Sequence, residues 1–148
     1  MEFKKGAGTM TVIQYLQQAF LLNQKINDKL EELGRLRALS TSIGAADTSQ
    51  EKISTGKVSD IVGNTVPRII ELNSKINADI DKCCDKKQQI EKHIEKIKNN
   101  NYRLILLKRY IHFKEWEDIC NDLGYSYRHI TRLHSEALQE FRKILKMS

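Results

Sequence analysis

The sequence predicts an all-α fold in two parts: a long antiparallel helical hairpin, then a compact group of three short helices. Two long segments repeat apolar residues at three- and four-residue steps, with a polar, aperiodic segment between them. Shorter amphipathic segments with helix-end signals follow in the last fifty or so residues. One proline and seven glycines among 148 residues impose few breaks, so long helices are allowed.

The first nine residues, "MEFKKGAGT", lack the apolar periodicity that begins after Met10. We interpret residues 1–9 as an expression leader and exclude them from the expected fold. The helical hairpin is then expected over residues 10–98 and the group of short helices over residues 99–148, which we expect to fold on its own.

The first long helix is expected over residues 11–39. Its apolar stripe consists of Ile13, Leu16, Phe20, Ile26, Leu30, Leu33 and Leu36. Residues 40–60 are small, polar and aperiodic, which predicts a flexible loop acting as a linker rather than as a binding loop.

The second long helix has an apolar spacing near 3.5 residues, which is typical of a coiled coil. Its stripe consists of Ile69, Leu72, Ile76, Ile80, Cys83, Ile90, Ile94 and Ile97. Pro67 fits the first turn if Thr65 caps the helix, whereas an earlier start at Ser59 would place a kink there. Two helices leave part of each stripe uncovered, so we expect two hairpins to pack together as a homodimer.

Residues 102–113 predict a short helix with Leu104, Leu107 and Ile111 inward. Residues 115–123 predict a second one, whose inward positions are Trp116, Ile119, Cys120 and Leu123. Gly124 stands where a left-handed residue ends a helix, and Ser126 where a side chain caps the next. A helix, a short glycine-containing turn and a second helix constitute a helix-turn-helix.

The last helix, expected over residues 127–146, has two chemically different faces. The apolar face consists of Ile130, Leu133, Ala137, Leu138, Phe141 and Ile144. The polar face contains no acid and consists of Arg128, Thr131, Arg132, Ser135, Gln139 and Arg142. Together with a net charge of +6, this face favours an anionic partner, in the first place double-stranded DNA.

Residues 114–145, "KEWEDICNDLGYSYRHITRLHSEALQEFRKIL", resemble region 4 of bacterial sigma-70 factors. The chain is more similar still to the ArpU-type late transcription regulators encoded by phages of Gram-positive hosts. The shared positions are Arg109-Tyr110, Trp116 to Ile119, Leu123 to Ser126, His134 and Ala137-Leu138, and "LGRLRALSTSI" at residues 33–43 also resembles that group. Lys114 departs from the pattern, because a capping serine or threonine would be expected there.

The resemblance implies that Tyr127, Arg128, Thr131 and Arg132 read bases. Arginine binds guanine O6 and N7 bidentately and threonine can contact a thymine methyl group, so the chemistry of the side chains agrees. Tyr125 and Ser126, at the helix N-terminus, are expected to touch phosphate. The expected DNA-binding set is therefore Tyr125, Ser126, Tyr127, Arg128, Thr131, Arg132, Ser135 and Arg142.

The expected function is that of a phage or prophage DNA-binding transcription regulator. Its hairpin would mediate dimerisation or contact with RNA polymerase or another partner. Two alternatives remain: a helical assembly protein such as a small terminase-like subunit, and an RNA polymerase-binding modulator that does not read DNA.

Other chemistry is not expected. Three cysteines argue against a disulfide framework, and Cys83 and Cys84 point about 100° apart on a helix, so no metal site is expected. The histidines are dispersed, and no phosphate-binding glycine loop or enzymatic carboxylate pair occurs, so neither catalysis nor a cofactor is expected. No apolar run suits a membrane span and no signal peptide opens the chain, which predicts a cytoplasmic protein without a membrane partner.

Overall fold

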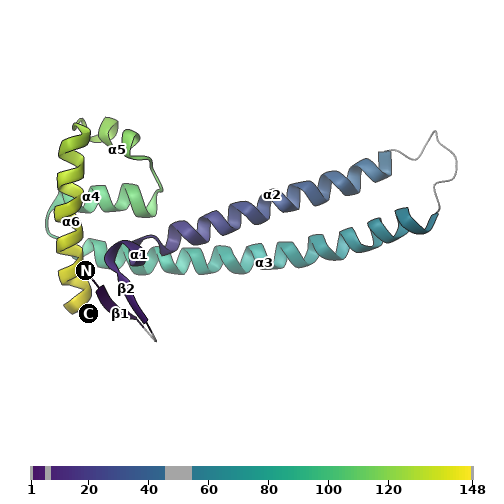
Figure 1. Ribbon diagram of the computed structural model, residues 1–148, viewed down its shortest axis with the longest axis horizontal. Coiled ribbons are helices and arrows are strands. Elements are labelled where there is room, and N and C mark those ends of the chain that lie inside the picture. Colours follow the sequence, from purple (N-terminus) through teal and green to yellow (C-terminus); the bar gives the residue numbers. More distant parts are fainter. Residues whose placement is uncertain (1, 6–7, 46–54, 148) are drawn as a thin grey trace. The chain divides into compact units, whose positions relative to one another are not determined.

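The computed structural model describes residues 2–5, 8–45 and 55–147, with side chains for residues 10–41 and 63–147 (Figure 1). The all-α class is confirmed, with one short strand pair in addition. The elements are β1 (Glu2–Lys5), β2 (Gly8–Thr11), α1 (Val12–Leu16), α2 (Gln18–Ala45), α3 (Thr55–Glu95), α4 (Asn100–Leu106), the π-helical turn η2 (Leu107–Ile111), α5 (Trp116–Leu123) and α6 (Tyr127–Met147).

The strand pair includes residues that the sequence analysis set aside as a leader. β1 and β2 are antiparallel, with Glu2 opposite Thr11 and Lys5 opposite Gly8. Thr11 then starts α1 through a capping box, because its hydroxyl accepts from the Gln14 amide at 3.1 Å and the Gln14 side chain accepts from the Thr11 amide at 2.9 Å. The start of α1 is thus fixed by local hydrogen bonds.

The two long helices are longer than their apolar stripes predicted. α2 continues to Ala45 and α3 begins at Thr55, so the loop expected over residues 40–60 is wrong at both of its ends; residues 46–54 lie outside the described part. Extending an existing helix fixes one residue per hydrogen bond gained, which allows small polar residues to continue it. Pro67 consequently lies inside α3, where it offers no amide to the carbonyl of Gly63.

The chain divides by its internal contacts into two compact units. Unit 1 comprises residues 1–22 and 83–148, and unit 2 comprises residues 23–82. This division passes through both long helices, whereas the sequence predicts a boundary between residues 98 and 99. The start of α2 and the end of α3 therefore belong with α4, α5 and α6.

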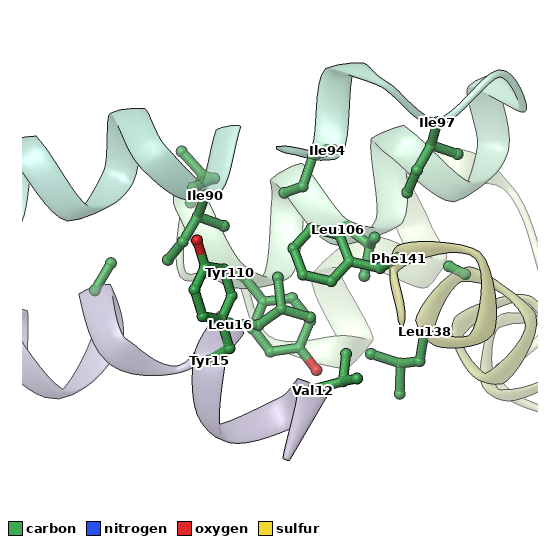
Figure 2. Packing of buried hydrophobic residues seen from close by; sticks show 13 residues of the cluster. Val12, Tyr15, Leu16, Ile90, Ile94, Ile97, Leu106, Tyr110, Leu138 and Phe141 are labelled. Atoms are coloured by element: carbon green, nitrogen blue, oxygen red, sulfur yellow. The ribbon is translucent and has the colours of Figure 1, made fainter. Parts of the chain in front are cut away.

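The main core of unit 1 explains this grouping (Figure 2). Phe141 of α6 is fully buried in one cluster with residues of α1 and of the end of α3. The buried members are Val12, Tyr15, Leu16, Ala19, Ile90, Ile94, Ile97, Leu106, Tyr110, Ile111, Ala137, Leu138 and Phe141. Residues 99–148 thus share their core with residues that the sequence analysis assigned to the hairpin.

A second cluster in unit 1 holds α4, α5 and α6 together. Its buried members are Ile105, Ile119, Ile130 and Leu133. Ile105 and Leu106 point inward, whereas Leu104, expected inward, is 41% exposed. The stretch 104–107 is apolar throughout, so periodicity alone does not identify its buried side. The helix also widens to a π turn at Leu107, which shifts the phase of the positions that follow.

Unit 2 consists of parts of α2 and α3 that run antiparallel (Figure 1). Lys29 of α2 donates a hydrogen bond to Asp79 of α3. The buried apolar residues of unit 2 are Ile26, Leu33, Leu36, Leu72 and Ile76. Asp79 is 4% exposed and accepts from Lys29 Nζ at 2.5 Å, with Lys25 at 3.9 Å. The hydrogen bond from Lys29 lowers the pKa of the Asp79 carboxyl below its usual value. The interface between α2 and α3 thus contains an ion pair formed by Lys29 and the buried Asp79.

Three residues expected in the buried stripes are instead exposed. Leu30 of α2 and Ile80 of α3 are 46% and 40% exposed, and Ile13 of α1 is 41% exposed. A stripe at three- and four-residue steps covers a wider arc than one partner helix can bury.

Replacing Phe141 with alanine should lower the free energy of unfolding of the full chain by about 3–5 kcal/mol, because it empties the centre of the unit 1 core. Met147, on the same helix, is 86% exposed. Met147→Ala should change that free energy by less than about 0.5 kcal/mol. Urea unfolding followed by circular dichroism measures both free energies. An equally small loss for Phe141→Ala and Met147→Ala would contradict this account of the core.

A fragment of residues 99–148 should melt at a lower temperature and less cooperatively than unit 1, because it lacks Leu16, Ile90 and Ile94. The control is a chain in which a flexible linker replaces residues 23–82, since it retains every member of both unit 1 clusters. Thermal unfolding compares the two at equal concentration. Equal melting temperatures would show that residues 99–148 are self-sufficient.

Candidate nucleic-acid interface

α5 and α6 are joined by a tight turn whose geometry follows from Gly124. Gly124 adopts φ 69° and ψ 29°, the left-handed conformation that glycine reaches without a steric penalty. The amides of Gly124 and Tyr125 both donate to the carbonyl of Cys120, the latter at 3.1 Å. α5 ends here as the sequence predicts.

Ser126 begins α6. Its hydroxyl accepts from the amide of His129 at 3.2 Å, and its carbonyl accepts from the amide of Ile130 at 3.0 Å. These bonds are those of an N-cap, as the sequence predicts. The hydroxyl that was expected to touch phosphate therefore caps the N-terminus of α6.

The first half of α6 carries an exposed polar row on the side opposite its buried face. The row, hereafter the α6 polar row, consists of Arg128, Thr131, Arg132 and Ser135, all exposed. Arg128 has no ion pair among the described residues. Arg132 donates to Nδ1 of His129 at 3.0 Å and lies 4.0 Å from Glu136, with its side chain 66% exposed.

The structure does not bring all eight expected residues into this row. Tyr127 is 66% exposed beside it. Tyr125 is half-buried against the second core cluster, with its ring centroid 4.6 Å from that of His129. Arg142 is also half-buried, and its Nε is buried without a hydrogen-bond partner among the described residues. The side chains of Tyr125 and Arg142 are thus less exposed than those of the α6 polar row.

The charges of the two helices have opposite signs. α6 contains five basic and two acidic residues, whereas α5 contains three acidic residues and no basic one. Asp122 of α5 accepts from Lys114 at 2.5 Å and from Lys108 at 3.1 Å, and these bonds lower the pKa of its carboxyl. Basic residues are therefore concentrated on α6, whereas the first turn of α5 carries the exposed side chains of Glu117 and Asp118.

The orientation of α6 depends on His134, whose role sequence reasoning missed. Its Nε2 shares a hydrogen bond of 2.8 Å with the Tyr110 hydroxyl, and its ring meets the edge of Trp116 at 4.6 Å. The guanidinium group of Arg109 lies over the Trp116 ring, with its carbon 4.9 Å from the ring centroid. The available signal was the position of His134 next to Leu133, on the buried side of the helix.

Burial perturbs both partners of that hydrogen bond. It lowers the pKa of His134 to about 4, with a further contribution from the charge of Arg109, and it raises the pKa of Tyr110 to about 12. Both groups are therefore neutral at neutral pH. A neutral His134 suits packing between the rings of Tyr110 and Trp116.

Other parts of the described chain offer less chemistry. A hollow between α2 and α3 in unit 2 is lined by charges of both signs, and Glu71 pairs there with Lys75 at 3.0 Å. No group of three or more His, Cys, Asp or Glu side chains that could hold a metal ion occurs in the described part. Within residues 2–5, 8–45 and 55–147, none of the helices combines the length and apolarity needed to cross a bilayer.

Comparison with known proteins gives one family. The model of that family, described as "Protein of unknown function (DUF1492)", matches residues 43–142. The match includes all the residues of the expected DNA-binding set, from Tyr125 to Arg142. No curated protein and no solved structure matches the chain significantly.

The free energy of unfolding should fall as the pH drops from about 6.5 towards 4. His134 has an ordinary pKa of 6.5 and a folded-state pKa of about 4, so the unfolded chain binds the proton more readily in this range. The contribution of neutral His134 to the free energy of unfolding is complete above pH 6.5 and is lost as the pH falls towards 4. Urea midpoints at successive pH values measure it. His134→Gln, which does not titrate there, should show a shallower decline, and equal slopes would refute the assignment.

Proposed function

The chain belongs to the DUF1492 family, and we propose that it is a DNA-binding regulator of transcription that reads its site with α6. In this proposal α5, the Gly124 turn and α6 form a helix-turn-helix, in which α6 enters the major groove. The observation that carries the proposal is the α6 polar row, four exposed residues without an acidic member on the helix that directly follows the turn.

The side chains of the row suit base edges. Arg128 and Arg132 lie one turn apart and present guanidinium groups, which pair bidentately with guanine O6 and N7. The Thr131 hydroxyl donates to the carbonyl of Tyr127 at 2.9 Å. This bond restrains the side chain, whose methyl group contacts a thymine methyl in this proposal. We assign base contacts to these three residues.

The other candidate residues receive different roles. Tyr125 and Ser126 position the helix, because one packs against the core and the other caps α6. Arg142 is left out of the base-reading set because its Nε is buried. Tyr127, beside the row, and Ser135, its last member, are both exposed, and we assign them contacts with the sugar-phosphate backbone.

Two further points support the proposal. The resemblance of residues 114–145 to region 4 of sigma-70 factors and to the ArpU-type regulators concerns these same helices. The anionic partner is also favoured by the net charge of +6 and by the excess of basic residues on α6. RNA polymerase contact and a phage origin are part of the proposal through the resemblance alone.

Replacing Arg128 or Arg132 with alanine should weaken binding to the preferred duplex by about 1–3 kcal/mol, or about 5- to 150-fold, if each contacts a base. Selection from a random duplex library with the full chain identifies that duplex first, and fluorescence anisotropy then measures affinity for it and for a scrambled duplex. The loss should be much smaller on the scrambled duplex, because non-specific binding depends on phosphate contacts.

Lys75→Ala is the matched control, because Lys75 is exposed, basic and distant in sequence from α6. It should leave both affinities nearly unchanged. Equal losses on both duplexes for the arginine variants would contradict base reading. No DNA binding by the folded parent chain would instead favour an assembly protein or a polymerase-binding modulator.

A further inference from the structure

α3 carries a second apolar face that α2 does not cover. Val66, Ile70 and Ile80 are 47%, 65% and 40% exposed. Continuing their spacing of alternating four and three residues gives the set Val66, Ile70, Asn73, Asn77, Ile80 and Cys84, hereafter the second seam. At about 100° per residue, these six positions fall within roughly 80° of one another on α3.

The second seam is distinct from the face of α3 that packs within the chain. The residues of α3 that face α2 in unit 2 include Thr65, Leu72, Ile76 and Asp79, all buried. Their mean direction is about 100° from that of the second seam. α3 therefore has two adjacent helix-packing faces, and only one of them is closed by α2. Ile76 belongs to the closed face and not to any surface open to another chain.

The second seam is free of charge along its whole length. Between residues 66 and 84, α3 has six charged residues: Arg68, Glu71, Lys75, Asp79, Asp81 and Lys82. None of them falls on the seam. On a helix with this many charged residues, a face in contact with water is expected to carry some of them. A face that packs against another helix excludes charged residues.

The composition of the second seam is symmetric about its centre. When two copies are laid antiparallel across a two-fold axis, Val66 meets Cys84, Ile70 meets Ile80 and Asn73 meets Asn77. Apolar side chains thus meet apolar or thiol side chains, and the two central asparagines meet each other. Paired asparagines at seam positions can hydrogen-bond across the interface and specify its register. An isologous interface requires this kind of self-complementarity.

We propose that two copies of this chain associate through the second seam of α3, antiparallel and across a two-fold axis. Each copy contributes α2 and α3, so that four helices surround a common core. The seam runs for about 27 Å at ~1.5 Å per residue, a length typical of stable helix-bundle contacts. Leu30 of α2 is also apolar and 46% exposed. The inference does not depend on DNA binding.

The experiment uses the native Cys84, which is exposed on α3. In the full-length variant Val66→Cys, the new thiol should lie opposite Cys84 of the second copy. Oxidised glutathione should then convert most of the protein to a disulfide-linked dimer on a non-reducing gel. Within one chain the two thiols are about 27 Å apart on a helix, too far for a bond.

Two controls test the register. The double variant Val66→Cys with Cys84→Ser should give at least a tenfold smaller yield of covalent dimer. Lys75→Cys, which places a thiol on the opposite side of α3, should also cross-link poorly. Equal yields from Lys75→Cys and Val66→Cys would overturn the proposed register.

Light scattering tests the association without oxidation. The parent chain should have twice the mass of one chain at micromolar concentration, and Ile70→Asp should have the mass of one chain. Ile70 is 65% exposed, so the helical circular dichroism signal of that variant should stay at the parent level. A monomeric parent, or a folded Ile70→Asp that remains dimeric, would overturn the proposal.

Discussion

The burial of Phe141 is the constraint on which the rest of unit 1 depends. Its ring is fully enclosed by residues from α1, the end of α3 and η2 (Figure 2). A closely packed core holds α6 at a fixed rotation, because turning the helix would expose Phe141 and bury arginine. The exposure of the α6 polar row is therefore a consequence of what is packed on the opposite side of the same helix.

A contact between polar side chains helps to determine the geometry of each unit. In unit 1, His134 is neutral and sits between the Tyr110 hydroxyl and the Trp116 ring, which relates α6 to η2 and α5. In unit 2, Asp79 is charged and bonded to Lys29, which relates α3 to α2. Removing one partner of either pair leaves a polar group unsatisfied, so a slipped arrangement of the helices is disfavoured. These contacts provide specificity that apolar packing alone lacks.

α3 combines two requirements in one helix. Its buried face needs apolar residues to pack against α2, and its second seam has the same spacing with more exposed side chains. The two faces are adjacent, so a single periodic stripe in the sequence contains members of both: Ile76 is 4% exposed and Ile80 is 40% exposed. A proposed dimer would cover the second face, and the proposed DNA-reading helices belong to unit 1 of each copy.

The sequence by itself determined the features that depend on neighbouring residues. Gly124 ends α5 and Ser126 caps α6, and the buried face of α6 from Ile130 to Phe141 follows the 3.6-residue period, because backbone conformation and helix periodicity are local properties. Only the tertiary structure decided that Phe141 shares a core with Leu16 and Ile94, that Leu30 and Leu104 are exposed, and that the Nε of Arg142 is buried. These outcomes depend on contacts between residues far apart in the chain, and periodicity gives the direction of a side chain without identifying the partner that covers it.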